Sequence, residues 1–193
     1  KGNNIGFVTG KVFFFDNPNI LQSAGRDVEE NRLPGKLVGN GEKDLGQFDE
    51  IKEYDYVDDV MLLVNPELIR KIGSYSPNFF LYFEETDWCR RAKDQGFRIV
   101  YTPDAKIWHK VSMSSGGNRL YNSNFVFYYN MNEIIFLRKN FEDKIILFHL
   151  LSLLFTFPKI SLNFIIKGHV KLISDFLRGI ILGLRYCINP KRN

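Results

Sequence analysis

Apolar and β-branched residues run almost unbroken through 5–15 (IGFVTGKVFFF), which predicts a buried strand. A turn sequence, DNPN, follows at 16–19, and the next apolar run, ILQSAG, predicts a second short strand. Residues 25–50 show no period and are rich in Gly, Asp, Glu and Asn, as in a long functional excursion. The apolar pattern resumes at 54–65, which predicts a strand interrupted by two acids.

Helix-bounding residues mark two short helices in the middle of the chain. Pro66 lies in the first turn of one and Gly73 lies just beyond its end. The sequence ETDWCRRAKDQ (85–95) predicts the other helix, which Gly96 ends. Three extended segments are predicted around these helices: NFFLYF (78–83), FRIVYTP (97–103) and AKIWHKV (105–111).

The last third of the chain has helical spacing. SMSSGGNRLYNSN (112–124) predicts a polar loop, either a flap over bound substrates or a plain linker. Residues 125–141 predict a helix, and apolar runs broken by Pro158 and lysines follow. We expect no membrane-spanning helix, because no stretch reaches about eighteen uninterrupted apolar residues. Amphipathic helices are expected across 125–193.

Charge divides the chain into two parts. The net charge is +4, but 144–193 carries eight Lys or Arg residues and one acid, Asp175, whereas 1–143 has a net charge of −3. Basic residues interleaved with Ile and Leu suit an anionic membrane surface. They lack the stacking aromatics of a nucleic-acid groove, so we expect no nucleic-acid binding. The alternative to membrane binding through 144–193 is a pair of helices packed on the protein's own core.

Cysteine content and the first residues bear on location. Only Cys89 and Cys187 occur, without metal-ligand spacing, which excludes a disulfide framework and favours a reducing compartment. The chain shows no secretory signal and opens directly on a strand sequence, so we expect a fragment whose N-terminal part lies elsewhere. Together with the basic tail, these features predict a peripheral protein on the cytoplasmic face of the cell membrane.

Three acids, Glu84, Glu85 and Asp87, directly follow the aromatic run 78–83. One acid in a first helical turn needs no function, because free N–H groups stabilise it there. Crowded, partly desolvated carboxylates have raised pKa values, which suit a general base. His109 on a later strand could face them, and the set would suit a divalent metal or a phosphate-bearing substrate. The alternative is a capped helix and a hydrogen-bonded histidine.

From Ile5 to about Arg185, the chain resembles the C-terminal half of family 2 glycosyltransferases, in the bacterial rhamnosyltransferase-like branch. The most specific part is an acid pair, one residue, a third acid, and then GF-IVY-P-A-IWH. The resemblance runs in order through GFVTGKVFFFDNPNILQSAG, YVDDVMLLVNPELIRKIGSYSPNFFLYFEETDWCRRAKDQGFRIVYTPDAKIWH, FYYNMNEIIFLRKNF and HVKLISDFLRGIILGL.

The resemblance implies an α/β fold, the C-terminal half of a GT-A fold with a mixed sheet, flanking helices and C-terminal amphipathic helices. Residues 1–124 would form the acceptor-binding half with the catalytic base, and 125–193 a membrane-associating extension. The implied reaction is inverting transfer from a nucleotide-sugar donor. The implied acceptor is lipid-linked or a polysaccharide, in bacterial cell-surface glycan synthesis.

The resemblance also implies roles for individual residues. Glu85, where many relatives have Asp, matches the catalytic base. Glu84 and Asp87 match acids on the acceptor side. His109 matches a histidine that can complete a divalent-metal site for Mn or Mg at the diphosphate, where the metal neutralises the leaving group.

Two features depart from the family pattern. Asp58 and Asp59 occupy positions where relatives usually have a small residue and Gly, so they either bind sugar hydroxyls or mark an altered pocket. The family's Asp-x-Asp, with the main metal ligands, would lie upstream of Lys1. A non-catalytic membrane-binding remnant is therefore an alternative function. A metal-dependent hydrolase built on the same acids and His109 is a third, without family support.

Because the nucleotide-binding motif is expected upstream of Lys1, the chain by itself should bind nucleotide sugars weakly. Isothermal titration of a nucleotide sugar into the purified chain would measure this. A micromolar dissociation constant would contradict the expectation.

Overall fold

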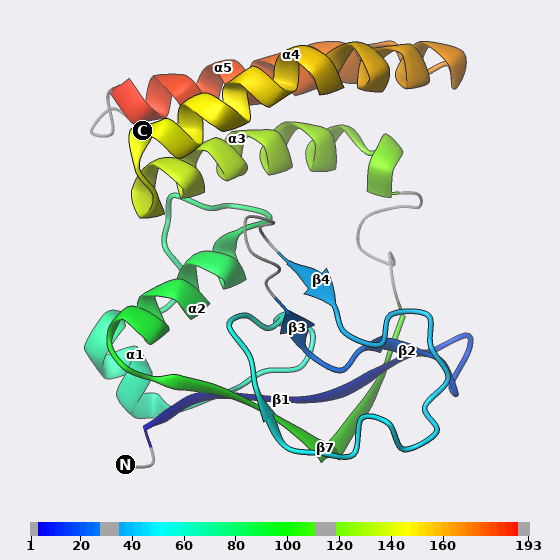
Figure 1. Ribbon diagram of the computed structural model, residues 1–193, viewed down its shortest axis with the longest axis vertical. Helices are drawn as coiled ribbons and strands as arrows, with labels where there is room; N and C mark the ends of the chain where they lie inside the picture. Colours follow the sequence, from blue (N-terminus) through cyan, green and yellow to red (C-terminus); the bar gives the residue numbers. More distant parts are fainter. Residues whose placement is uncertain (1–3, 28–34, 111–118, 189–193) are drawn as a thin grey trace. The chain divides into compact units, whose positions relative to one another are not determined.

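The computed structural model describes residues 4–27, 35–110 and 119–188, so most of the predicted loop 112–124 lies outside the described residues. The described chain is α/β, with a mixed, curled sheet and five α-helices (Figure 1). It forms two compact units. The sheet unit comprises Lys1–Asn78 with Glu84–Val111, and the helical unit comprises Phe79–Phe83 with Ser112–Asn193. This division lies near residue 111, whereas the sequence placed it at 124.

The sheet unit is built around the long strand predicted at the start of the chain. β1 pairs in parallel with β7, and in antiparallel fashion with β2 and β6, while β5 pairs with the other edge of β7. A separate two-stranded ribbon joins β3 and β4. The strands are β1 (Ile5–Phe14), β2 (Leu21–Ser23), β3 (Arg26–Asp27), β4 (Lys36–Leu37), β5 (Lys52–Glu53), β6 (Leu63–Val64) and β7 (Arg98–His109).

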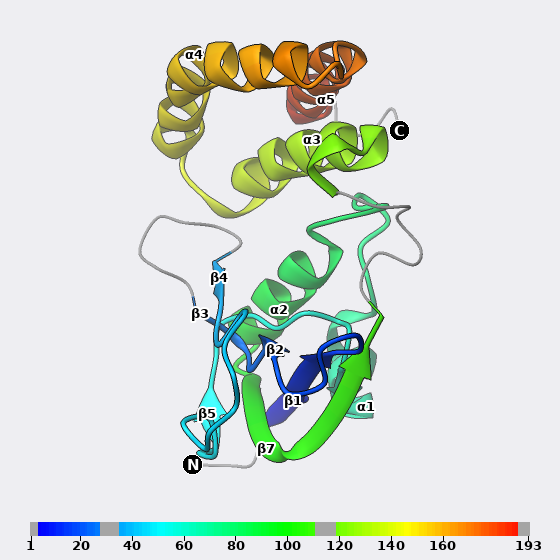
Figure 2. The ribbon, with the colours of Figure 1, turned by 90° about the vertical axis from the view of Figure 1, so that its right-hand side faces the viewer.

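β7 is one bent strand where the sequence predicted two (Figure 2). It pairs with β1 as far as Tyr101 and again from Lys106, so four residues of β7 bulge opposite the single residue Gly10. A Cβ at Gly10 would lie 2.3 Å from the carbonyl oxygen of Ala105, so the bulge needs a glycine there. Pro103 lies inside the bulge, where no ladder hydrogen bond requires its missing N–H.

Two helices pack on the sheet unit at the predicted positions. α1 (Pro66–Ile72) is capped by the side chain of Asn65, and α2 spans Glu84–Asp94. The predicted strand 54–65 is mostly irregular, because its aromatic and apolar side chains enter the core beneath α2 instead of a ladder. This core consists of Phe7, Tyr56, Val57, Leu68, Trp88, Cys89, Ala92, Phe97 and Ile99.

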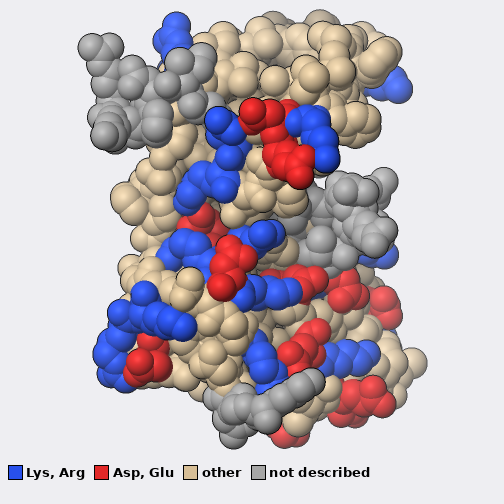
Figure 3. All heavy atoms as spheres, turned by 60° about the vertical axis from the view of Figure 1, so that its left-hand side comes forward, with Lys and Arg blue, Asp and Glu red and all other residues tan. Residues whose placement is uncertain are grey.

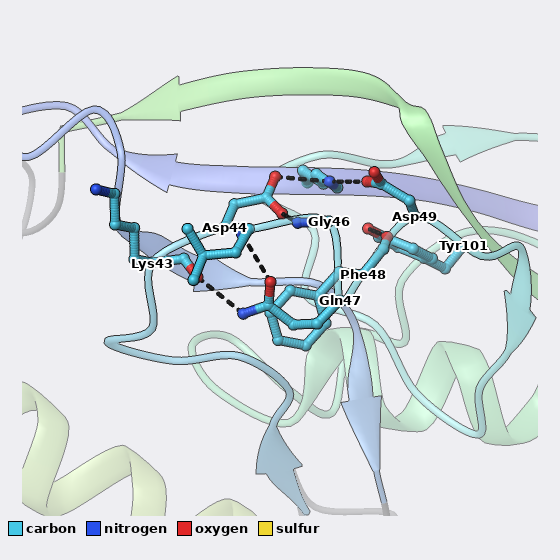
Figure 4. A network of polar contacts seen from close by, with 9 residues as sticks. Lys43, Asp44, Gly46, Gln47, Phe48, Asp49 and Tyr101 are labelled. Atoms are coloured by element: carbon cyan, nitrogen blue, oxygen red, sulfur yellow. Dashed lines mark hydrogen bonds and ion pairs between the residues drawn. The ribbon is translucent and has the colours of Figure 1, made fainter.

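A buried cation fixes the long excursion to the sheet. Lys11 on β1 is 1% exposed, and its ammonium group donates to Asp44 at 2.6 Å and to Asp49 at 2.5 Å. Burial acts to lower the pKa of Lys11, but the two carboxylates outweigh it and raise the pKa. Figure 4 shows Asp44 and Asp49 on the loop; nearby, the Tyr101 hydroxyl donates to the Phe48 carbonyl at 2.8 Å.

The helical unit contains the helices predicted in the last third of the chain. Its elements are η1 (Arg119–Tyr121), α3 (Ser123–Asn140), α4 (Asp143–Ile166) and α5 (Lys171–Ile188). α3 and α5 approach closely at Gly179 and Gly183, where added Cβ atoms would lie 2.5 Å and 2.8 Å from α3 carbonyl oxygens. α4 continues through Pro158, because side chains on both sides of the proline pack into one apolar cluster.

The segment 78–83 is a series of bends and not the predicted extended run. Tyr82 and Phe83 have φ angles of 67° and 69°, a left-handed conformation that is uncommon outside glycine. The buried side-chain amide of Asn132 on α3 donates to the carbonyls of Leu81 and Tyr82, at 2.8 and 2.9 Å. The ring of Phe83 packs near Phe136, with centroids 5.6 Å apart. These contacts hold the turn that precedes α2.

Lys11→Met should destabilise the chain by about 2–4 kcal/mol, because it leaves the Asp44 carboxylate without its buried cation. Asp49→Asn should cost less than about 1 kcal/mol, because Asp49 is 61% exposed. Urea unfolding of both variants measures the difference. Equal losses would show that Lys11 does not anchor the loop through a buried pair.

Candidate active site

The first turn of α2 carries the acid pair singled out from the sequence. Glu84 and Glu85 directly follow the left-handed residues Tyr82 and Phe83, so the turn decides where the helix begins. Backbone strain of this kind, of order 1–3 kcal/mol per residue, gathers at functional sites. The acid pair therefore directly follows two residues that the fold holds in an unfavourable backbone conformation.

Glu85 is a carboxyl with a raised pKa. Burial and the neighbouring charge of Glu84 raise the pKa of Glu85 to about 7, and the charge of Asp58 acts in the same direction. A hydrogen bond from its own backbone N–H and the charge of Arg26 act to lower it, but they do not compensate for the burial. The group is thus poised to take up or release a proton near neutral pH.

Asp58 lies beside this helix turn because of the core beneath α2. Tyr56 and Val57 pack in the same cluster as Trp88 and Cys89 of that helix, which brings the next residue, Asp58, near Glu85. The backbone of Arg26 forms a bridge with Tyr56, and the Arg26 guanidinium pairs with the Asp58 carboxylate. One acid near Glu85 is therefore held by a cation.

Asp59 is reached by a tyrosine that the sequence analysis did not single out. The Tyr75 hydroxyl donates to Asp59 at 3.1 Å, and its ring packs near Trp88, with centroids 4.7 Å apart. Burial raises the pKa of Tyr75 far above its usual value, and the charges of Asp59, Glu85 and Glu84 raise it further. Tyr75 thus stays a hydrogen-bond donor among the acids.

Asp87 has a different environment from the acid pair. Its buried carboxylate accepts a 2.7 Å hydrogen bond from Arg91, one helical turn further along α2. Arg91 also donates to the carbonyls of Ile72 and Ser74, at 2.8 and 2.7 Å. Asp87 therefore orients the arginine that satisfies the C-terminal end of α1, which is a structural role.

His109 lies at the far end of β7, half-buried, with Nδ1 2.8 Å from Oε1 of Gln22 on β2. If Nδ1 carries the proton, this contact leaves Nε2 as a free ligand atom. The charges that shift the pKa of Glu85 are those of Glu84, Asp58 and Arg26. Contacts and charges thus join Glu84, Glu85, Asp58 and Asp59 into one acidic group, whereas the contact of His109 is with Gln22 on β2.

Within the described residues, no three His, Cys, Asp or Glu side chains are grouped closely enough to hold a metal ion. His109 therefore belongs to no such group in the described part of the chain. A complete divalent-metal site is therefore not formed by the described part of the chain. This arrangement gives no support to the metal-dependent hydrolase.

The chain is similar to the dTDP-rhamnosyl transferase RfbF of Shigella flexneri. The two are 27% identical over an alignment of 136 positions, and the match covers 64% of this chain and 46% of the relative. The chain thus spans about half the length of that protein, and it matches no protein-family model. At a coarse level, this distant similarity relates the chain to glycosyltransferases, and its α/β fold with a mixed, curled sheet is compatible with part of a nucleotide-sugar transferase.

Sequence reasoning missed two polar members of the acidic group, Arg26 and Tyr75. Arg26 directly follows the QSAG stretch, which offered a positional signal. Tyr75 lies between α1 and α2 in a stretch without a motif, and only the packing of its ring beside Trp88 reveals its place.

Glu85→Gln should stabilise the chain progressively as the pH rises. The folded-state pKa of Glu85, about 7, lies above its ordinary 4.5, so the folded state binds the proton more tightly than the unfolded state. Wild-type stability therefore falls as pH rises from about 4.5 to 7, and the variant escapes this loss. The advantage of the variant should grow by about 2 kcal/mol between pH 5 and pH 8.

Urea unfolding at both pH values measures this growth. Burial also raises the pKa of Glu133 on α3 to about 7, but that contribution is common to both proteins and cancels in the comparison. Asp94→Asn, which removes an exposed carboxylate from the same helix, is the matched control. Parallel pH profiles for Glu85→Gln and wild type would show that Glu85 is not the group that titrates.

Proposed function

We propose that this chain is the acceptor-binding, base-carrying part of a glycosyltransferase that uses a nucleotide-sugar donor. The observation that carries the proposal is Glu85: a half-buried carboxyl whose pKa of about 7 suits a general base, beside three further acids. The distant similarity to a rhamnosyl transferase supports the reaction class. We infer the C-terminal part of a GT-A fold, with which the mixed sheet is compatible.

In this proposal Glu85 receives the proton of an acceptor hydroxyl. The acceptor oxygen forms a bond to the anomeric carbon from the face opposite the leaving group, which inverts the configuration. The bond between that carbon and the phosphate oxygen breaks, and the nucleotide diphosphate leaves with the electron pair. General-base assistance of this kind contributes about 10²–10⁴-fold in rate.

The neighbouring polar groups suit recognition of sugar hydroxyls. Asp59 is held by the Tyr75 hydroxyl and Asp58 by Arg26, so both carboxylates keep fixed positions, and a carboxylate offers several acceptor sites for hydroxyl groups. Glu84 keeps the pKa of Glu85 high through its charge. Asp87 is engaged by Arg91, so we place it in support of α2 and not at the acceptor.

The donor, the metal and the acceptor follow from the same proposal. dTDP-rhamnose is the first donor to test, because the relative is named for dTDP and rhamnose. We propose that a Mn or Mg ion would hold the diphosphate, with His109 as the ligand that the family resemblance implies for this chain. We propose a lipid-linked or polysaccharide acceptor in cell-surface glycan synthesis.

Glu85→Gln should lower the turnover number by about 10²–10⁴-fold, because the variant has no carboxylate to accept the hydroxyl proton. The substitution should be made in the longest natural polypeptide that contains this chain, with transfer of rhamnose from dTDP-rhamnose as the assay. Asp94→Asn on the same helix should retain activity within about twofold, because that carboxylate pairs only with Arg90 on the surface.

The pH dependence separates a base from a merely structural residue. Wild-type activity should rise about tenfold per pH unit below a pKa near 7 and then level off, because only ionised Glu85 accepts a proton. Residual activity of Glu85→Gln should lack this rise. If Glu85→Gln transferred sugar as fast as the wild type, Glu85 would be excluded as the base. If the wild-type polypeptide were folded but had no transfer activity, the non-catalytic remnant would be favoured.

A further inference from the structure

α4 has two apolar faces, and only one of them is covered. The inward face follows heptad spacing and packs with α3 and α5 through Leu153, Phe157, Ile160 and Phe164. The outward face repeats at the same three- and four-residue spacing, over an arc of about 120° at roughly 100° per residue. Its exposed members are Leu147, Phe148, Leu151, Leu154, Phe155, Leu162, Ile165 and Ile166, which we call the α4 stripe.

The stripe is far more apolar than an ordinary protein surface. In Figure 3 the described side chains along the top edge of the view, where α4 and α5 lie, are mostly tan, with Lys and Arg side chains at the margins. Single exposed apolar residues are normal, but eight on one helix face mark an interaction surface.

Charge identifies what covers the stripe. Lys159 lies at its edge, Lys167 and Lys171 follow its C-terminal end, and no acid occurs from Lys144 to Ser174. Within the described residues, Lys159, Lys167 and Lys171 form no ion pair. A second copy of the same stripe would bring lysines against lysines, whereas anionic lipid phosphates complement them.

We propose that the α4 stripe lies in the surface of an anionic lipid bilayer, with its lysines at the headgroups. Of the described helices, α4 alone is long and apolar enough to cross a membrane, with a mean hydropathy of 1.9 over its most apolar stretch. Crossing would strip the inward face from α3 and α5 and expose Asn163, which contacts the Tyr121 hydroxyl at 3.3 Å. Lying in the surface leaves this packing intact. The proposal does not depend on sugar transfer.

Sedimentation of the purified chain with vesicles tests the surface directly. It should bind phosphatidylcholine vesicles that contain phosphatidylglycerol, bind pure phosphatidylcholine weakly, and dissociate as salt is raised. The double variant Leu154→Asp/Phe155→Asp should lose at least about tenfold in partitioning, because two apolar side chains no longer enter the acyl boundary. Lys159→Gln should lose about fivefold on the anionic vesicles alone.

The control makes the same change, two exposed apolar residues replaced by Asp, in the sheet unit. Leu154 and Phe155 are 67% and 76% exposed, and Leu45 and Ile51 of the sheet unit are 78% and 69% exposed. Leu45→Asp/Ile51→Asp should therefore bind vesicles like wild type, and circular dichroism should show both double variants folded.

Three results would overturn the proposal. The first is equal binding of the stripe variant and the control. The second is a wild-type dimer in solution that the stripe variant dissociates without any change in vesicle binding, which would assign the stripe to a second copy. The third is a chain that stays in cell membranes through an alkaline carbonate wash, which would indicate that α4 crosses the bilayer.

Discussion

The amide of Asn132 holds a turn that the backbone would otherwise avoid, and the position of the acid pair depends on it. Two consecutive left-handed residues, Tyr82 and Phe83, cost of order 1–3 kcal/mol each. Two hydrogen bonds from Asn132, at about 1 kcal/mol each, and the burial of Phe83 offset that cost. The next residue starts α2, so the acids emerge at its first turn and not one turn further along the chain.

Two acids on α2 have different roles because their surroundings differ. Asp87 has a guanidinium partner at 2.7 Å and serves to hold α1 against α2. Glu85, two residues earlier, has burial and like charges around it, so its proton is retained until the pH approaches 7. The family resemblance assigned both acids to one site, because a sequence pattern does not show which partner each side chain meets. The structure divides the roles between a support and a candidate base.

The sequence predicted what local rules determine. Pro66, Gly73 and Gly96 bounded α1 and α2 correctly, and the unbroken apolar run at 5–15 predicted β1, because capping and periodicity act within a few residues. Prediction from the sequence failed where contacts between residues distant in the chain determine the structure. Residues 97–103 and 105–111 were predicted as two strands, but the bulge opposite Gly10 accommodates Pro103 within one strand. The proximity of Arg26 to Asp58 depends on a bridge between segments thirty residues apart in sequence, for which no local pattern exists.

The close approach of α5 to α3 at Gly179 and Gly183 has a consequence for the turn that precedes α2. Gly183 faces the carbonyl of Met131, the immediate neighbour of Asn132, so the last helix sets how that stretch of α3 is seated. A bulky residue at 183 would push on the backbone that presents the amide to the turn. A lesion in the final helix, more than ninety residues downstream, could thus imitate the loss of an acid on α2. Truncations made to remove the apolar C-terminal region would carry the same hidden effect.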